Sequence, residues 1–329
     1  MKKILIYNIF IFIILFCLLE ISVRVFNLSN LLGIDSNLIV KNSDSISYKP
    51  NMESTIFGKK VYTDKFGYRV PYKNYKYSGG KSFLILGDST SYGVGVKEER
   101  TFIGALRKKF PNINFYNSSL PGHDLKDHIK IVSSIPQDLK IKKIWYFLNL
   151  NDIDYLFNSA IQNLEKEKKY KNKINLIQKL KTNNFLLELN YFLRSKSALY
   201  VYIKSILIDP SKIHFFRTYN NYIDSDNFEK YEKKLDEFLS KKIEGLDLTV
   251  FILPWEFQTR EICKNKDLFL PQDLLIRYLK KKEIDFIDFS SYFCDKDNFE
   301  KMYLKFDPAH LSSEGHDLME KLLINNNLL

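Results

Sequence analysis

The sequence places a serine where nucleophilic chemistry is feasible. Ser89 ends the triplet Gly87-Asp88-Ser89, which directly follows the apolar run at residues 83–86, and a segment with apolar residues at helical spacing begins near Glu98. This pattern predicts a buried strand, a turn and a helix, with Ser89 in the turn at the carboxyl end of the strand. Ligands bind at that edge of open α/β sheets, and free backbone N–H groups there stabilise developing negative charge.

A serine hydroxyl is a weak nucleophile until a base takes its proton, so a histidine and a carboxylate that orients it are also needed. The chain has five histidines, of which only His310 has an aspartate, Asp307, three residues upstream. Pro308 lies between them and stiffens the loop, so one tight turn can carry both base and orienter. We interpret His316, which follows in a segment of helical periodicity, as an ordinary helix residue.

Two further residues are candidates to bind the oxyanion of a tetrahedral intermediate. Asn151 follows the apolar run at residues 144–148, so its amide is expected at the end of a second buried strand. Gly122 follows residues 113–120, which predict a third strand end, and a glycine lets backbone approach a ligand closely. Each motif alone is common in turns, caps or surface pairs. Their order, each after a predicted strand or before the last helix, predicts a hydrolase-type serine site.

In these motifs the chain resembles the SGNH branch of the GDSL hydrolases, a family named for serine, glycine, asparagine and histidine in four separated blocks. The resemblance covers roughly residues 81 to 325, and its most specific part runs from Gly87 to Gly95. The chemistry that it implies needs no cofactor and no metal. The roles that it implies are nucleophile for Ser89, base for His310 and its partner for Asp307, with an oxyanion hole made by the backbone N–H groups of Ser89 and Gly122 and the side chain of Asn151.

The resemblance also implies a fold, the flavodoxin-like three-layer α/β sandwich with a mainly parallel five-stranded sheet. The triplet Gly67-Tyr68-Arg69, ahead of the first predicted strand, resembles the lead-in of exported bacterial members. Asn149 stands where the third block of the family often has a glycine. Many divergent members share that departure, so the expected activity stands.

The N-terminus predicts a membrane anchor. Lys2 and Lys3 precede an uncharged apolar run from residue 4 to residue 19, and residues 21–23 extend it past Glu20 to about twenty residues. No small-x-small cleavage site follows, so an uncleaved signal anchor over residues 1–25 is favoured, with a cleaved signal peptide as the alternative. We therefore expect a single-pass protein of the cytoplasmic membrane, with the lysines inside and the catalytic domain extracytoplasmic.

The formal net charge of +11 does not indicate a nucleic-acid-binding protein, because no recognition motif surrounds the basic residues. Lysines concentrate between Glu165 and Lys181, a stretch that is either a solvated helix face or a contact for anionic lipid or an acidic envelope polymer. Cys17 falls in the anchor. Cys263 and Cys294 are either one disulfide or two free thiols, and their spacing does not match the usual zinc patterns.

After the anchor, residues 26–80 are expected to form an extended extracytoplasmic lead-in, and residues 81–329 one α/β domain. A helical insertion at about 153–225 is too apolar to be disordered. Since it leaves the sheet just after Asn151, we expect it to cover the active site as a cap. The apolar runs predict five strands, the last of which alternates and is an expected edge, at residues 83–86, 113–117, 144–148, 248–253 and 284–289.

The resemblance and the location together imply an esterase acting through an acyl-enzyme on an ester-bearing small molecule or, above all, on O-acetyl groups of a cell-envelope glycan. The same residues also suit an O-acyltransferase that acts on an envelope polysaccharide. A non-catalytic envelope-assembly protein with the same fold is a second alternative, against which the intact serine, asparagine, aspartate and histidine argue. The sequence indicates no oligomeric state.

Overall fold

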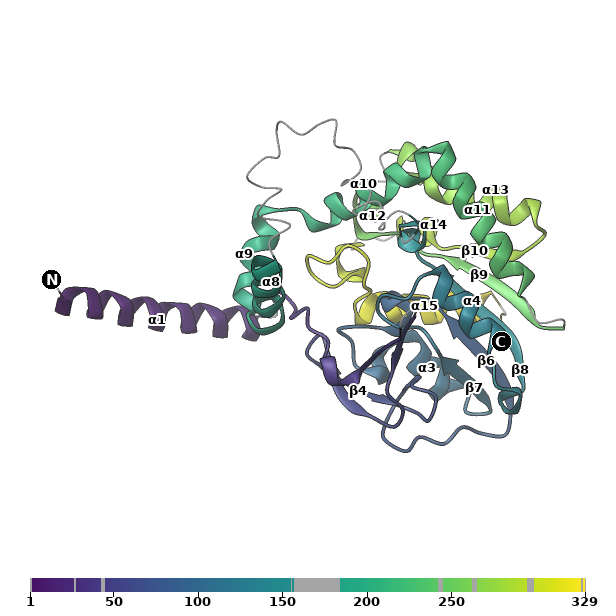
Figure 1. Ribbon diagram of the computed structural model, residues 1–329, viewed down its shortest axis with the longest axis horizontal. Coiled ribbons are helices and arrows are strands. Elements are labelled where there is room, and N and C mark those ends of the chain that lie inside the picture. The colour runs from purple at the N-terminus through teal and green to yellow at the C-terminus, as the bar shows by residue number, and fades with distance from the viewer. Residues whose placement is uncertain are drawn as a thin grey trace.

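Five parallel strands form the centre of the computed structural model, which describes residues 2–26, 28–42, 45–154, 156, 184–241, 245–261, 265–294, 299–326 and 328 (Figure 1). Their order in the sheet is β10-β9-β8-β6-β7, which is the flavodoxin-like order. All five predicted strands are confirmed, and the last one is the edge, as expected. The strands are β6 (Lys81–Leu86), β7 (Ile113–Asn117), β8 (Ile141–Leu148), β9 (Asp247–Ile252) and β10 (Asp285–Asp288).

The sheet is wider than the predicted five strands, because the segment expected as an extended lead-in adds three antiparallel strands to it. β3 (Glu53–Ile56), β4 (Lys59–Thr63) and β5 (Arg69–Val70) continue the order beyond β7, so the sheet has eight strands. β3 and β4 alternate exposed and buried side chains, and positive φ at Phe57 and Gly58 closes a two-residue turn between them. A separate hairpin pairs β1 (Ile39–Asn42) with β2 (Ser45–Tyr48).

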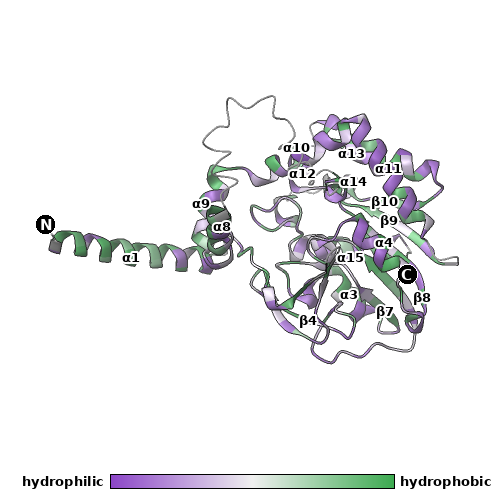
Figure 2. Cartoon of the chain, in the orientation of Figure 1, coloured by the Kyte–Doolittle hydropathy of each residue, from purple (hydrophilic) through white to green (hydrophobic). Residues whose placement is uncertain are grey.

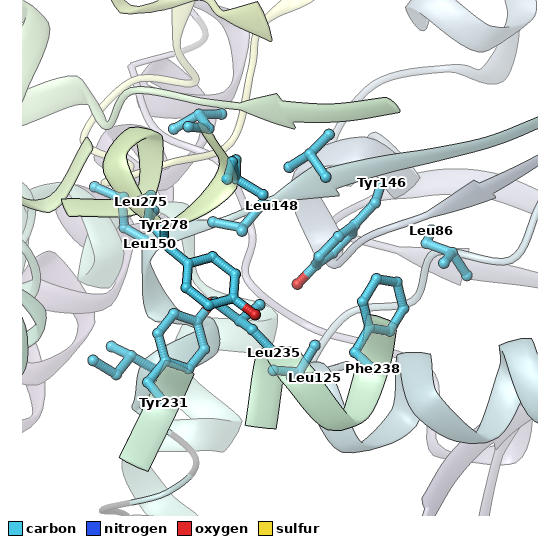
Figure 3. Packing of buried hydrophobic residues seen from close by; sticks show 14 of the residues in the cluster. Leu86, Leu125, Tyr146, Leu148, Leu150, Tyr231, Leu235, Phe238, Leu275 and Tyr278 are labelled. Carbon is cyan, nitrogen blue, oxygen red and sulfur yellow. The ribbon is translucent and has the colours of Figure 1, made fainter. Parts of the chain in front are cut away.

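Helices cover both faces of the parallel strands, and the two faces have separate apolar cores. Along β8, Tyr146 and Leu148 belong to one core, while Trp145 and Phe147 belong to the other. Figure 3 shows the first core, where Tyr146 lies beside Phe238 and Leu125. Each fully buried Leu or Phe side chain contributes about 1.5–3 kcal/mol, so these two layers hold the sheet's carboxyl edge in place. The first face is covered by α4 (Leu125–Ser133), α11 (Ser225–Ser240) and α13 (Leu270–Lys281), and the second by α3 (Phe102–Lys109) and α15 (Ser313–Asn325).

The first helix, α1 (Lys2–Val25), projects from the body of the molecule (Figure 1). An 18-residue window within its residues 3–25 has a mean hydropathy of 2.7, so α1 is long and apolar enough to cross a membrane. Figure 2 shows it as an almost continuously hydrophobic element. The expected anchor is therefore present as a helix of suitable length and composition.

The described part of the predicted insertion is helical, and α9 within it packs against α1. It comprises α8 (Asn184–Lys196), α9 (Ala198–Leu207) and α10 (Pro210–Ile223). The lysine-rich stretch from Glu165 to Lys181 lies outside the described residues. The remaining short elements are α2 (Ser89–Tyr92), α12 (Glu256–Glu261), α14 (Ser290–Cys294), η1 (Ser36–Leu38), η2 (Glu98–Arg100), η3 (Gln137–Leu139), η4 (Leu150–Ile153), η6 (Lys266–Phe269) and η7 (Phe299–Met302).

Candidate active site

Ser89 is the first residue of α2, which begins immediately after the carboxyl end of β6. Asp88 caps this short helix by accepting a 2.8 Å hydrogen bond from the Thr90 N–H. Gly87 has φ +153, and a Cβ there would lie 2.1 Å from the Ser91 hydroxyl and 3.0 Å from the Phe147 carbonyl. Only glycine fits this turn, so the Gly-Asp-Ser order brings the strand to a close and starts the helix on the serine.

A continuous chain of hydrogen bonds joins the three residues predicted to carry the chemistry. Nε2 of His310 lies 2.6 Å from the Ser89 hydroxyl, and Nδ1 of His310 lies 2.7 Å from a carboxylate oxygen of Asp307. The other Asp307 oxygen accepts from the backbone N–H groups of Ala309 (3.0 Å) and His310 (2.9 Å). The carboxylate therefore fixes the turn and the imidazole together. Since it accepts from Nδ1–H, it leaves Nε2 as the acceptor that faces the serine.

The charges of this buried pair support each other. Burial lowers the pKa of His310, but the negative charge of Asp307 and its hydrogen bond outweigh burial and raise the pKa above its usual value. For Asp307, burial raises the pKa, and the interactions with His310 outweigh it, so its pKa is lowered. Asp307 thus stays ionised and stabilises an imidazolium at His310, which is what a general base next to a serine requires.

His316 takes no part in this network. It lies in α15, fully buried, with its ring stacked on Phe102 and its Nδ1 facing the Phe102 N–H at 3.4 Å. Burial lowers the pKa of His316 to about 3. Its interpretation as a helix residue is confirmed.

The two expected oxyanion donors lie at the same edge of the sheet as Ser89. Asn151 is in η4, directly after β8, and Gly122 is in the loop between β7 and α4 with φ +86. In the described part of the chain, neither forms a hydrogen bond with the three residues of the network. The buried Asn151 Oδ1 has no hydrogen-bond partner among the described residues.

Asn149 makes structural hydrogen bonds that the sequence did not reveal. It stands at the position where a glycine is common in the family that the chain resembles. Its amide nitrogen donates to Asp88 Oδ2 and to the Thr90 hydroxyl, each at 3.0 Å. Its amide oxygen accepts from the indole N–H of Trp255. All four side chains are buried. Asn149 thus ties the end of β8 to the start of α2 and to the segment after β9.

A pocket of about 320 Å³ lies beside the network and is lined by Asp307 and His310. Phe57, from the turn between β3 and β4, meets the His310 ring edge-on with 5.5 Å between centroids. α9 and α10 form another side of the pocket, so the described part of the insertion lies against the site. The lining residues from these helices include Val201, Lys204, Ser205, Ile208, Ile213 and His214.

Phe57 and His214 were not recognised from the sequence. Phe57 belongs to a segment that was expected to be an extended lead-in, and a local signal for a hairpin there is Gly58, which suits the positive φ of a tight turn. His214 has no aspartate three residues upstream, as His310 has, so the sequence did not mark it as a site residue. Burial lowers the pKa of His214. Both reach the site through contacts between distant parts of the chain.

Arg69, the last residue of the triplet Gly67-Tyr68-Arg69, supports the active site through its hydrogen bonds. From β5 its buried guanidinium donates three 2.7 Å hydrogen bonds, to the carbonyls of Tyr92, Gly93 and Val96. These carbonyls belong to the last residue of the serine helix and to the loop that follows it, so the lead-in stabilises the end of this helix and the loop. The motif is therefore part of the site's support.

Among the described residues, no group of three or more His, Cys, Asp or Glu side chains is arranged to hold a metal ion. Cys263 lies outside the described residues, so the structure does not test whether Cys263 and Cys294 form a disulfide or are two free thiols. Cys17 is a free, exposed cysteine in α1.

No model of a protein family matches the chain, and no curated protein matches it. The chain is similar to a solved member of the lipolytic protein G-D-S-L family from Veillonella parvula DSM 2008, with 12% identity, coverage of 75% of this chain and 97% of that chain, and a TM-score of 0.39. A lipase/acylhydrolase from Enterococcus faecalis shows 11% identity, coverage of 75% and 94%, and a TM-score of 0.41. An acetyl xylan esterase from Geobacillus stearothermophilus shows 13% identity, coverage of 76% and 96%, and a TM-score of 0.42.

The solved structures that the chain resembles are thus lipolytic G-D-S-L proteins and esterases, the class of protein that its motifs resemble.

Proposed function

We propose that this protein is a serine esterase of the SGNH type, and one observation carries the proposal. The Ser89 hydroxyl, the His310 imidazole and the Asp307 carboxylate form an unbroken hydrogen-bonded series at the carboxyl edge of a parallel sheet. A serine in this arrangement is an activated nucleophile with a pocket beside it.

The geometry supports the following sequence of steps. His310 Nε2 takes the proton of Ser89 as the oxygen attacks the ester carbonyl, and the Asp307 carboxylate stabilises the imidazolium that forms. The C–O bond of the tetrahedral intermediate breaks, and His310 gives its proton to the departing alkoxide. Water then attacks the acyl-enzyme, with His310 acting as base again, and releases the acid and free Ser89.

The oxyanion needs hydrogen-bond donors during both steps, and we propose three. The Ser89 N–H is at the first helical position of α2, where a backbone donor has no partner inside the helix. The Gly122 N–H and the Asn151 amide are the other two, from the neighbouring strand ends. Such donors typically contribute about 3–4 kcal/mol each to transition-state stabilisation.

The proposed substrates are esters, in particular O-acetyl esters on a cell-envelope glycan. The location supports this class: α1 is suited to anchor the chain, with Lys2 and Lys3 on the cytoplasmic side and the catalytic domain outside. An acetyl group is small enough for the pocket of about 320 Å³. The glycan itself is an expectation from the resemblance and the location.

Covalent labelling tests the nucleophile. The full-length protein in detergent should be labelled by an organophosphonate at Ser89, and Ser89→Ala should remove both the label and the hydrolysis of a chromogenic acetyl ester. Equal labelling of the alanine variant would refute the assignment. The same assay with and without glycan acceptors distinguishes the esterase from an acyltransferase, because only a transferase makes an acetylated acceptor.

A further inference from the structure

Glu20 fixes the outer end of α1 to the start of α9. Its carboxylate accepts hydrogen bonds from the Ser197 hydroxyl (2.8 Å) and from the backbone N–H groups of Ala198 and Leu199 (2.9 Å each). These N–H groups are unpaired within the helix, and a carboxylate at a helix N-terminus is also favoured by the helix dipole. Arg24 adds a 2.7 Å bond to the Lys196 carbonyl. A charged residue in an otherwise apolar span thus serves as the cap of another helix.

An apolar groove of about 730 Å³ lies between α1 and α9 beyond this cap. α9 also exposes apolar side chains along it, with Leu207 77% exposed and Phe12 of α1 69% exposed. An open apolar surface of this kind marks an interaction site rather than an ordinary protein surface. The groove is lined from α1 by Phe12, Leu15, Phe16 and Leu19, and from α9 mainly by Leu199, Ile203 and Leu207.

The α1 residues of the groove decide what occupies it. They lie in the middle and outer half of the helix proposed to cross the membrane, so lipid must surround them. The α9 side chains that line the same groove lie beside the outer part of α1. In Figure 1, α8 and α9 run across the end of α1. If α1 crosses the membrane, α8 and α9 therefore lie parallel to the membrane surface. Arg194, Lys196 and Lys204 on these helices suit the headgroup region.

We infer that α8 and α9 form an interfacial layer, the α8–α9 layer, which lies in the outer leaflet beside α1 with lipid acyl chains in the α1–α9 groove. The partner is the lipid bilayer itself. This inference rests on the proposed anchoring of α1. It gives the chain a second, shallow contact with the membrane in addition to the span.

The layer also determines which way the active site faces. On α9, Ile203 and Leu207 line the groove, whereas Val201 and Ser205 line the pocket beside His310. Lys204 and Ile208 border both. The pocket is thus separated from lipid by the thickness of one helix, about 10 Å. Esters carried by molecules that sit in the membrane surface are therefore the substrates closest to the site.

Tryptophan quenching tests the layer in the full-length protein reconstituted into vesicles. The native Trp145 and Trp255 are buried, so an introduced tryptophan supplies the signal. Leu207→Trp should be quenched by lipids brominated near the headgroup, at least about twofold more than Tyr72→Trp. Tyr72, which is 57% exposed, lies in the loop that leads to the amino end of β6, away from the membrane in this arrangement. Phe12→Trp, quenched by deeply brominated lipids, reports whether α1 has inserted.

The outcomes separate the inference from the function on which it rests. Quenching of Leu207→Trp and Phe12→Trp, but not of Tyr72→Trp, supports the layer. Quenching of Phe12→Trp alone overturns it, and the absence of quenching in all three overturns the anchoring as well. Hydrolysis of a water-soluble acetyl ester by the same samples reports on the esterase chemistry independently of both.

A kinetic measurement tests the α8–α9 layer without an introduced tryptophan, which could itself disturb the layer. Leu207→Asp should lower the rate on an ester embedded in vesicles by about tenfold, because a carboxylate opposes burial in lipid, and should leave the rate on the soluble acetyl ester unchanged. Tyr72→Asp is the matched control and should change neither rate. Equal rates of Leu207→Asp and the unaltered protein on the embedded ester would contradict the inference.

Discussion

The Asn149 amide donates a 3.0 Å hydrogen bond to the Asp88 carboxylate, and both residues are buried. The bond links the carboxyl ends of two adjacent strands at the point where the serine helix starts. Asn149 stands at the position where a glycine is common in the SGNH family, and its side chain makes this bond.

The first prediction concerns this bond. Asn149→Ala should lower the free energy of unfolding by about 2–4 kcal/mol, because Asp88, Thr90 and Trp255 all lose a buried partner. Urea unfolding measures the change, and Asn220→Ala, at an exposed position of α10, is the control. Equal stability of the two variants would mean that water replaces the lost amide.

The second prediction concerns the choice of histidine. His310→Ala should reduce kcat on a chromogenic acetyl ester by at least about a thousandfold, since His310 is the base that faces Ser89 in the described part of the chain. His316→Ala should lower the melting temperature, because it empties a buried site against Phe102, and should leave kcat within a few-fold. A larger loss of kcat in the His316 variant would show that the wrong residue has been named as base.

The third prediction concerns pH. His310 must be neutral to accept a proton, so kcat/KM should rise as the pH passes its pKa, which lies above the usual 6.5 because the interactions with Asp307 outweigh burial. Asp307→Asn removes the negative charge that favours the imidazolium, so the pKa falls and the acid limb should move to lower pH. The plateau should also fall by about 10³- to 10⁴-fold, because the tautomer is no longer fixed. An acid limb that does not move would assign it to another group.

The fourth prediction concerns the oxyanion. Asn151→Ala should cost about 100- to 1,000-fold in kcat, because the amide would bind the oxyanion more strongly than the ground-state carbonyl. Steady-state kinetics with a short acetyl ester, and a melting curve to show that the variant is folded, provide the measurement. A change confined to KM would mean that Asn151 only positions the substrate.

The sequence was sufficient for the parts of the molecule that depend on local pattern. The apolar runs around Phe83 and Trp145 are buried on both faces, so their strands were recognisable, and the Asp307–His310 turn is defined within four residues. The parts that it missed depend on contacts between distant segments. Phe57 reaches His310 only because the β3–β4 hairpin joins the sheet beyond β7. The placement of α9 depends on the carboxylate of Glu20, near the N-terminus of the chain.

Phe57 and Asn149 illustrate two different limits. Residues 53–63 were expected to be part of an extended lead-in, and nothing in that segment told which edge of the sheet a hairpin there would join. Asn149 appeared only as a departure from a family pattern, and its three hydrogen bonds became visible when β6, β8 and the segment after β9 were brought together.

The bond between Glu20 and Ser197 has a consequence for biosynthesis. The two residues are 177 positions apart, so a ribosome makes the carboxylate on the order of ten to thirty seconds before its partner. During that interval Glu20 has Arg24, four residues along α1, as its ion-pair partner but lacks its three donors at the start of α9. A charged pair of this kind favours a position at the outer boundary of the span. The order of synthesis thus makes insertion of the anchor the first event and its contact with α9 a late one, so that removal of α1 at any stage would deprive the Ala198 and Leu199 N–H groups of the Glu20 carboxylate.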